Sequence, residues 1–522
     1  MLTAWTQPEK QLNNRVVNLP RGKFLGGSSG LNATLILRGL RSDYDSWLEA
    51  GNIGWGWEDV LPFFKKSETF VSTNGYQADL DFHGTEGIIH TSMPPPLAIN
   101  DPLVESFIDK GIPYQPDMHV KGEAVDGVGI ATRTIHQWST NQRVADYVNI
   151  DPPANLHVAY NTTVLRIILD DQSSGATTAP KYTATTVAAE IKNETGTVEM
   201  VTYRARKEII LSAGAYNSPF LLLHSGVGPK DHLKEVGIEV KVDLKGVGRN
   251  LGDHMLLNQL YQVKDIATED IHYWPPGAEA GVREWIEKKT GPMASFCVGV
   301  LAFKDLSDRI INKPLWRAAK VANPDADISG HLPGQPHVEY YPIASAIGSE
   351  LPTKGETIVG LAAMLFGFDQ PGTVTLRSSN PHDPPKINHN YLSSELDLAL
   401  YVEAARFGHE IMVEGSGTHD HIVGPWPVDR IVPSTDEEWK EFVKEGVTTD
   451  FHPSSTCKMG PDTDEEAVVD PRLRVRNVAG LRVADISILP TLVHGHTQAV
   501  AYMIGEKAAD MILEDNRVKA AI

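Results

Sequence analysis

The stretch from Arg21 to Asn32 reads RGKFLGGSSGLN and contains two adjacent glycines and two adjacent serines. These residues leave backbone amides open, so such a loop can approach a phosphate group without obstruction by large side chains. The apolar stretch Leu31 to Leu37 is compatible with a helix, whose positive N-terminal end would face the loop. The pattern therefore favours a nucleotide site over a flexible linker, which is the other interpretation of a Gly/Ser loop.

Two strand–turn–helix units are predicted further along the chain. In the first, the strand Lys207 to Leu211 leads into a helix for which Ser218 suits the N-cap, Pro219 the first position and Gly226 the stop. In the second, the strand Leu481 to Asp485 precedes a helix that is capped by Thr497 and carries apolar residues at helical spacing. Three more strands are predicted from alternating β-branched residues, over Thr162 to Asp171, Thr183 to Lys192 and Val198 to Ser212.

Composition limits the class of protein. A chain of 522 residues with 41% hydrophobic residues is long enough for two domains. Its formal net charge of -20 argues against nucleic acid as a partner, and its two cysteines, Cys297 and Cys457, exclude a disulfide framework. The longest apolar run, Val359 to Phe368, is about half of the ~20 residues that a membrane-spanning helix needs, so we expect no membrane span.

Five segments carry a resemblance to a known family. They are GKFLGGSSGLN from Gly22, SAGAYNSPFLLLHSGVGP from Ser212, GVGRNLGDH from Gly246, FHPSSTCKMG from Phe451 and the stretch from Leu481 to Ile512. In this order they resemble the motifs of the glucose-methanol-choline (GMC) oxidoreductases. The resemblance spans nearly the whole chain, and it implies an α/β fold, α+β overall, with non-covalent FAD and a hydroxyl-bearing small molecule as substrate.

The family's domain plan and site residues can be carried over to this sequence. The resemblance implies an FAD-binding domain of Rossmann type over 1–65, 155–255 and 470–522, and a substrate domain over 66–154 and 256–469 that is built on an antiparallel sheet flanked by helices. It also implies that His452 and His496 are the active-site side chains. The implied cofactor contacts are Gly26, Gly27, Ser28, Ser29, Asn32 and Ala33 in the loop, Val164 on the adenine side, Ala213, Asp485 at the pyrophosphate or ribityl chain, and Thr497 and Gln498 at the flavin's pyrimidine edge.

The chemistry of alcohol oxidation requires such a pair of histidines. Transfer of a hydride from a carbinol carbon to flavin N5 requires loss of the hydroxyl proton, and a neutral imidazole is suited to accept it. We expect His452 to be this base and His496 to hydrogen-bond the same oxygen. The helix that starts near Thr497 would in addition favour negative charge on the reduced flavin.

A metal site is the alternative interpretation of these histidines. His494 and His496 form a His-x-His pair, but no nearby Cys, Asp or Glu in the sequence completes a set of ligands. His419 and His421 form a second such pair, which we expect on a strand face or a solvated loop. We therefore expect no metal.

One family element is missing from the sequence. GMC enzymes open with a strand, a G-x-G-x-x-G turn and a helix that bind the ADP half of FAD, whereas residues 1–20 contain no glycine. We expect an N-terminally truncated FAD-binding domain, which favours an incomplete chain over a remnant that no longer binds flavin. Two alternatives to an alcohol oxidase or dehydrogenase stay open: a non-redox, lyase-type member of the same fold, and an inactive remnant.

Overall fold

The computed structural model describes residues 2–72, 76, 78–93, 97–118, 120–123, 126–130, 132–136, 140–141, 153–172, 180–294, 297–322, 331–332, 334–347, 351–367, 371–428 and 430–521. Phe368, which ends the longest apolar run, lies outside these residues.

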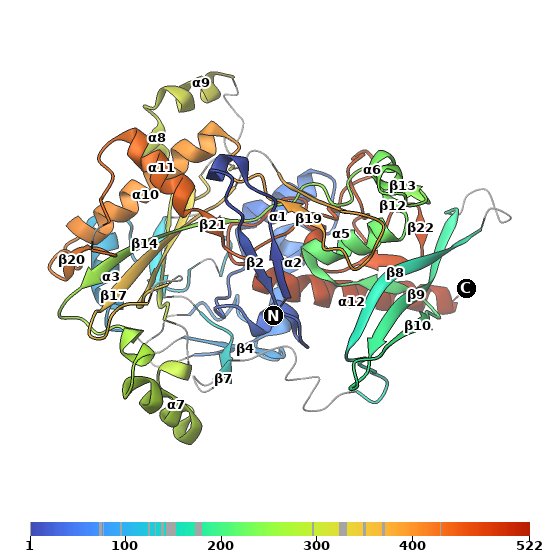
Figure 1. Ribbon diagram of the computed structural model, residues 1–522, viewed down its shortest axis with the longest axis horizontal. Coiled ribbons are helices and arrows are strands. Elements are labelled where there is room, and N and C mark those ends of the chain that lie inside the picture. The colour runs from blue at the N-terminus through green and yellow to red at the C-terminus, as the bar shows by residue number, and fades with distance from the viewer. Residues whose placement is uncertain are drawn as a thin grey trace.

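A seven-stranded antiparallel sheet forms one end of the molecule (Figure 1). Its strand order is β20-β14-β17-β16-β15-β5, and the short strand β21 also pairs with β14. The bounds are β5 Gly127–Ile130, β14 Met255–Val263, β15 Val300–Lys304, β16 Val338–Ile343, β17 Ile358–Leu365, β20 Ile422–Pro425 and β21 Thr448–Thr449. The expected antiparallel substrate sheet is thus present.

Both faces of this sheet are covered, because β16 and β17 are buried at every position. On β17, Leu361 and Ala363 belong to the core beneath the helices, whereas Ala362 and Met364 pack on the other side against the segment around Leu35. The helices on the first face are α3 (Asn100–Asp109), α10 (Glu395–Glu414) and α11 (Asp436–Gly446). The opposite face of the sheet therefore points to the Gly/Ser loop and the residues that follow it.

The other end of the molecule contains a four-stranded sheet and a small parallel sheet (Figure 1). The four-stranded sheet consists of β8 (Thr162–Asp171), β9 (Tyr182–Lys192), β10 (Val198–Arg204) and β22 (Val478–Ala479). The parallel pair is β11 (Ile209–Leu211) with β23 (Leu481–Val483), and Ile210 on β11 is 43% exposed. The expected truncation of the nucleotide-binding sheet stays a prediction.

The helices of this second end pack around one apolar core. They are α1 (Arg41–Glu49), α2 (Trp57–Ser67), α5 (Gly214–His224), α6 (Lys230–Glu235) and α12 (Thr497–Ala521). The core joins α2, α5 and α12 to the short parallel sheet through residues such as Phe64, Leu222 and Met503. The predicted strand at Leu481 and the predicted helix near Thr497 are confirmed, but Thr497 is the first residue of that helix and not its N-cap.

Smaller elements complete the described part of the fold. The helices are α7 (Gly277–Lys288), α8 (Ser307–Ile310) and α9 (Pro314–Ala322). The paired strands are β1 (Leu2–Trp5) with β2 (Asn18–Arg21), β3 (Glu68–Val71) with β4 (Ile89–Ser92), β6 (Ile135–His136) with β7 (Thr140–Asn141), β12 (Val227–Gly228) with β13 (Val242–Asp243), and β18 (Thr373–Thr375) with β19 (Lys386–Asn388).

The hairpin β1–β2 lies between the two ends of the molecule (Figure 1). Its side chains Leu12, Val17 and Leu19 belong to the core of the seven-stranded sheet, although residues 1–65 were expected in the FAD-binding domain. The domain boundaries therefore stay a prediction.

The helix after β11 begins earlier than its sequence predicts. α5 starts at Gly214, so Ser218 is not its N-cap and Pro219 lies inside it. Proline lacks the N–H that would reach the carbonyl four residues back, Ala215 O, and the Thr456 hydroxyl donates to that oxygen instead at 2.6 Å. The predicted stop is confirmed, because Gly226 follows the helix with a positive φ of 80°.

Two other local predictions were wrong. The segment Val198 to Ser212 forms two strands, β10 and β11, which belong to different sheets. The stretch Leu31 to Leu37 is not helical: it begins in a turn, Thr34 has a positive φ of 65°, Leu35 is bridged to Arg133, and the amide of Ile36 donates to Thr132 O at 3.3 Å. Pairing with a neighbouring segment outweighed a helical propensity that Thr34 and Ile36 already weaken.

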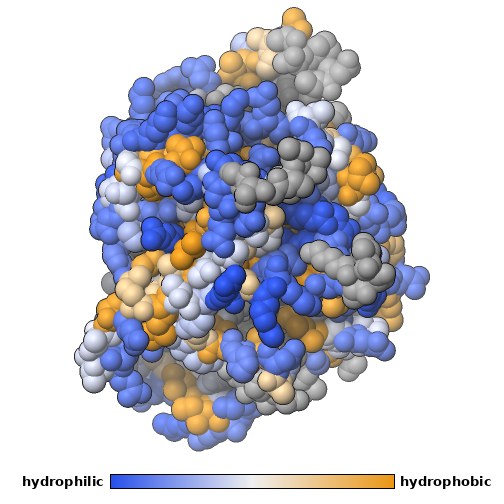
Figure 2. Space-filling view, turned by 90° about the vertical axis from the view of Figure 1, so that its right-hand side faces the viewer, coloured by the Kyte–Doolittle hydropathy of each residue, from blue (hydrophilic) through white to orange (hydrophobic). Residues whose placement is uncertain are grey.

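The surface at the second end of the molecule is mainly hydrophilic, with apolar residues in separate patches (Figure 2). Strand β10, at this end in Figure 1, exposes Val198, Met200 and Tyr203. Within the described part of the chain, we find no helix both long and apolar enough to cross a membrane.

Candidate active site

The structure brings the two predicted histidines together. The ring centroids of His452 and His496 are 4.9 Å apart, and their planes are nearly perpendicular at 85°. His452 follows β21, which pairs with the central strand β14, and His496 directly precedes α12. The seven-stranded sheet and the second end of the molecule therefore each contribute one imidazole.

Contacts behind His452 fix this side chain. The carboxylate of Asp253 accepts a hydrogen bond from the backbone amide of His452 at 2.7 Å. On the ring, Nδ1 lies 3.0 Å from Nδ1 of His254 and 3.2 Å from Oδ2 of Asp450. Among the described residues, Nε2 of His452 has no hydrogen-bond partner, and the side chain keeps 11% exposure. The free ring nitrogen is therefore the one available to a ligand.

Burial lowers the pKa of His452 well below its ordinary value, and the neighbouring imidazoles of His496 and His254 add to this effect. The pKa of the fully buried His254 is lowered in the same way, first by burial. His452 is therefore neutral at pH 7 and able to accept a proton.

His496 lies in the opposite electrostatic environment. Its Nε2 is 2.9 Å from Oε1 of Glu339, a residue of β16 with no exposed surface. Burial alone would lower the pKa of His496, but the charge and hydrogen bond of Glu339 and the charge of Asp450 raise it above its ordinary value. Two imidazoles in contact thus have pKa values shifted in opposite directions.

Asp450 is a third titratable group at this site. Burial raises the pKa of its carboxyl to about 7, while the charge of His496 and a 2.7 Å hydrogen bond from the Tyr341 hydroxyl act in the other direction. Tyr341 is on β16, two residues from Glu339, so this strand carries one acidic partner of the histidine pair and hydrogen-bonds the other through Tyr341.

Donor atoms of Asp450, His452 and His496 lie within 4.8 Å of one another, a spacing that a metal ion would tolerate. The sequence pattern did not indicate that these three residues lie together. Because Glu339 and Tyr341 already engage His496 and Asp450, we interpret the group as a proton-handling cluster. The absence of a metal stays a prediction.

The predicted cofactor loop and the start of α12 meet beside this cluster. Gly26 and Gly27 have positive φ values of 92° and 55°, and a Cβ on Gly27 would meet no atom within 4 Å. Ser29 hydrogen-bonds with the hydroxyl of Tyr502 on α12, and that hydroxyl accepts a hydrogen bond from Nε2 of Gln498 at 2.8 Å. The Oε1 atom of Gln498 is buried and has no hydrogen-bond partner among the residues that the structure describes. An open glycine backbone and an orphaned amide oxygen fit a bound FAD.

Other predicted cofactor residues lie on the same side of the molecule. Asp485 accepts hydrogen bonds from Ser487 N at 2.8 Å, Gly214 N at 2.9 Å and Ser218 Oγ at 2.5 Å, so it braces the turn that begins α5. In that turn, Ala213 is exposed.

The remaining predicted contacts belong to β8 and to the end of the Gly/Ser loop. Val164 is half-buried on β8, and Ser28 and Asn32 are exposed. Ala33 accepts a hydrogen bond through its carbonyl from Arg133 Nη1 at 3.0 Å. Thr497 is the first residue of α12. Their contacts with FAD stay predictions.

Comparisons with known proteins agree with this geometry. A model of the N-terminal part of the GMC oxidoreductases matches residues 5–256, and a model of the C-terminal part matches residues 369–505. The chain belongs to the GMC oxidoreductase family. An oxygen-dependent choline dehydrogenase from Sinorhizobium fredii is 33% identical over 97% of this chain and 84% of its own length.

Solved GMC structures superpose closely on the chain. A formate oxidase from Aspergillus oryzae has a TM-score of 0.89 at 27% identity, covering 99% of this chain and 88% of its own. A fungal aryl-alcohol oxidase has a TM-score of 0.81 at 25% identity, covering 98% and 89%. The fold class, the family and the FAD-dependent oxidoreductase class are thereby confirmed.

Sequence reasoning missed the acidic partners of the histidine pair. Asp450 stands two residues before His452, and Glu339 is a charged residue inside the apolar strand sequence HVEYYP. A charge in the middle of a buried strand is costly unless it has a function, and this signal could have identified Glu339.

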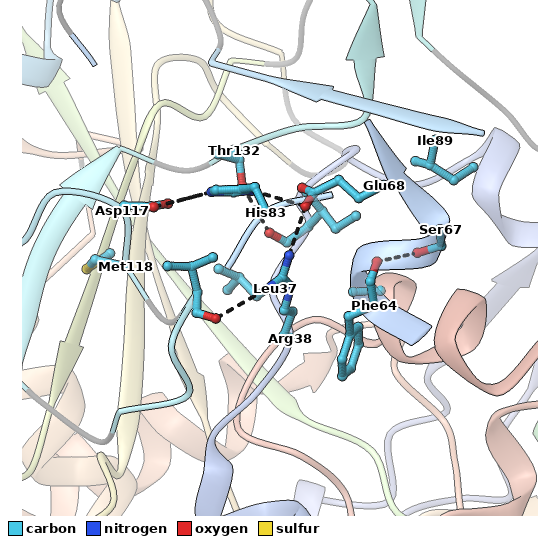
Figure 3. A pocket seen from close by; sticks show the side chains of 13 residues that line it. Leu37, Arg38, Phe64, Ser67, Glu68, His83, Ile89, Asp117, Met118 and Thr132 are labelled. Atoms are coloured by element: carbon cyan, nitrogen blue, oxygen red, sulfur yellow. Dashed lines mark hydrogen bonds and ion pairs between the residues drawn. The ribbon is translucent and has the colours of Figure 1, made fainter. Parts of the chain in front are cut away.

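A second buried polar group, well separated in sequence from the histidine pair, surrounds a cavity of about 30 Å³ (Figure 3). Glu68 accepts hydrogen bonds from Arg38 at 2.8 Å and from Thr91 at 2.7 Å, and its Oε2 lies 3.0 Å from Nδ1 of His83. Nε2 of His83 lies 3.2 Å from both carboxylate oxygens of Asp117. We interpret this network as a structural element, since its side chains satisfy one another.

Proposed function

We propose that this protein oxidises the CH–OH group of a small alcohol, with His452 as the base and His496 as a protonated hydrogen-bond donor. The observation that carries the proposal is the opposite shift of two adjacent imidazoles: the pKa of His452 is lowered, and that of His496 is raised by Glu339. Neighbouring groups with separated pKa values are what paired acid and base roles require.

The geometry supports a different role for each histidine. The free Nε2 of His452 accepts the hydroxyl proton of the substrate, while the Nδ1 edge of His496 donates to the same oxygen. Because Glu339 occupies Nε2 of His496, this imidazolium is held as a donor and stabilises the negative charge that develops on the oxygen. Gly26, Gly27 and Gln498 would hold the FAD. When bound, FAD would accept the hydride from the carbinol carbon.

Relatives suggest the substrates to test. The choline dehydrogenase and the aryl-alcohol oxidase act, by their names, on alcohols. A panel of choline, benzyl alcohol and short aliphatic alcohols therefore samples the family. Bleaching of the flavin absorbance under anaerobic conditions by at least one alcohol supports the proposal, whereas turnover without bleaching points to a lyase-type member.

Substitution of the base gives the sharper test. We expect His452→Asn to lower the rate of flavin reduction by ~10²- to 10⁴-fold, since a positioned base contributes about that factor. His419→Asn is the matched control, because His419 is on an exposed loop. Equal rates in His452→Asn and the wild type would refute the assignment of the base.

Glu339→Gln tests the role of His496. Loss of the carboxylate removes the charge that raises the pKa of His496, so the imidazole loses its proton at lower pH. Activity should therefore decline at a lower pH than in the wild type as the pH rises. Glu437→Gln on the exposed face of α11 is the control, and an unchanged pH profile in Glu339→Gln would exclude this role.

A further inference from the structure

Arg133 is a fully buried cation close to the histidine pair. Its side chain has no exposed surface, and its Nη1 donates to the carbonyl of Ala33 at 3.0 Å. The other two guanidinium nitrogens, Nε and Nη2, are buried and have no hydrogen-bond partner in the part of the chain that the structure describes. Two of the three nitrogens of this group are thus without a partner.

The guanidinium keeps its charge in this position. Burial lowers the pKa of Arg133 only to about 10, so the group is protonated at neutral pH. Among the described residues, no carboxylate lies within 4.0 Å of it. A buried charge without a counter-ion is unfavourable, which indicates that the site is completed by an anion.

The location of Arg133 connects it to the catalytic cluster. Its charge acts on His496 and lowers the pKa of that imidazole, so the two side chains are within electrostatic reach. Arg133 also interacts with the thiol of Cys297, which is only partly buried. The next residue, Thr134, accepts a hydrogen bond from Gln498 at 3.3 Å. The cation therefore lies between the expected cofactor wall and the substrate side.

The two free nitrogens are neighbours on one edge of the guanidinium. Nε–H and one N–H of Nη2 point in parallel, and this fork matches the two oxygens of a carboxylate. We propose that Arg133 binds a carboxylate of the substrate, so that the protein acts on hydroxy acids whose hydroxyl group lies at His452 and His496. The placement of the hydroxyl group at His452 and His496 rests on the proposed function, but the binding of a carboxylate by Arg133 does not.

Binding of acetate tests the carboxylate end without turnover, because acetate has no hydroxyl group to oxidise. We would measure acetate and acetamide by calorimetry with the FAD-loaded protein, in the presence of EDTA. The fork predicts that acetate binds at least about tenfold more tightly than acetamide, since a hydrogen bond to a charged group is stronger than a neutral one. Equal affinities would overturn the proposal.

Two variants locate the site. Arg133→Gln should lose the preference for acetate over acetamide, and Arg133→Lys, which keeps the charge but lacks the fork, should lose most of it. Arg317→Gln on the surface helix α9 is the matched control and should bind like the wild type. Far-ultraviolet circular dichroism of each variant reports folding, and the wild-type comparison stands even if Arg133→Gln does not fold.

Glycolate and ethylene glycol then test the substrate class. Glycolate has a carboxylate where ethylene glycol has a hydroxymethyl group, so the wild type should reduce its flavin at a lower concentration of glycolate than of ethylene glycol. The ratio of the two concentrations that give half-maximal reduction should fall about tenfold in Arg133→Lys. Retention of acetate binding in Arg133→Lys would overturn the proposal. A shift of the flavin spectrum in Arg133→Lys with no acetate binding in the wild type would overturn it in favour of the flavin ring as the occupant.

If no alcohol bleaches the flavin but acetate binds through Arg133, the proposed function fails and the carboxylate site stands. If neutral alcohols bleach the flavin and acetate does not bind, the reverse holds.

Discussion

Asp450 is a buried carboxyl group that lies against the histidine pair. Its pKa is raised to about 7 from 3.8, first by burial. Between these two values the folded protein binds a proton that the unfolded chain has released, so stability falls as the pH rises through this window. The carboxyl group therefore costs stability at neutral pH.

Replacement of Asp450 by Asn should remove this pH dependence. Asparagine still accepts the hydrogen bond from Tyr341 but does not ionise. We expect Asp450→Asn and the wild type to have similar free energies of unfolding near pH 4, and the variant to be the more stable at pH 8 by at most about 4 kcal/mol. Urea unfolding at both pH values measures this difference, with the exposed Asp510→Asn as control. The prediction would be contradicted if the difference in free energy of unfolding between the variant and the wild type were the same at both pH values.

The two histidines were predictable because each stands in a sequence motif, but their partners were not. Glu339 and Arg133 are more than a hundred residues from His452, and only the pairing of β16 and the segment around Leu35 brings them near it. Contacts of this kind depend on tertiary structure, which local patterns do not encode.

The strands β3 and β4 depend on the buried network around Glu68. Burial alone would raise the pKa of Glu68, but the hydrogen bond from His83 and the charge of Arg38 lower it to about 2. A carboxyl group with a lowered pKa contributes stability above pH 4.5 and loses it as the pH falls through about 2. The network therefore stabilises this region at neutral pH.

Glu68→Gln should destabilise the protein strongly, because Arg38 remains buried without its counter-charge. We expect a loss of about 3 to 5 kcal/mol at pH 7 in urea unfolding. The exposed Glu86→Gln on the adjoining loop is the matched control. The difference between Glu68→Gln and the wild type should narrow between pH 4.5 and pH 2, and a constant difference would argue against an ionised Glu68.

Pro219 in α5 leaves the carbonyl of Ala215 dependent on the Thr456 hydroxyl. Thr456→Val removes the hydroxyl that donates to Ala215 O and leaves this carbonyl buried beside Pro219. We expect a loss of about 1 to 3 kcal/mol, whereas Thr456→Ser keeps the donor and should lose less. Thermal unfolding of both variants measures the comparison, and equal losses would mean that the hydroxyl is not what stabilises the helix.

Secondary structure was predictable where the periodic pattern was long. The helix from Thr497 and the strand over Thr162–Asp171 have the predicted type, because each carries apolar residues at one regular spacing. The stretch Leu31 to Leu37 failed because it is short, and its pairing with Thr132 and Arg133 decided its conformation. Ser218 failed as a cap because Gly214 already allowed the turn one helical turn earlier.

The histidine pair His452 and His496 lies at the junction of the two ends of the molecule. His496 belongs to the end that contains α12. Glu339 and the strand β21, which His452 follows, belong to the seven-stranded sheet. The two-part plan followed from the family motifs, but the packing of the hairpin β1–β2 on the seven-stranded sheet did not. Short strands of mixed composition carry no signal for which of two sheets they join.

Binding of FAD should stabilise the molecule as a whole, since a ligand that binds only the folded state adds to its free energy of unfolding. We expect an increase of about 2.7 kcal/mol at an FAD concentration of 100 times the dissociation constant. Urea unfolding with and without FAD measures the increase. An unchanged midpoint at millimolar FAD would favour an inactive remnant.

Gly27→Ala shows whether this stabilisation comes from the Gly/Ser loop. A methyl group on Gly27 meets no protein atom within 4 Å and costs only the strain of a positive φ, about 1 kcal/mol, in the protein without FAD. If the cofactor lies against this backbone, the same methyl group blocks its approach, and the FAD-dependent increase should fall by more than half. Gly505→Ala in the exposed face of α12, where a methyl group is equally free, should keep the full increase. Equal increases in the two variants would remove the loop from the cofactor site, because the strain at Gly27 is present with and without FAD and cancels in the increase.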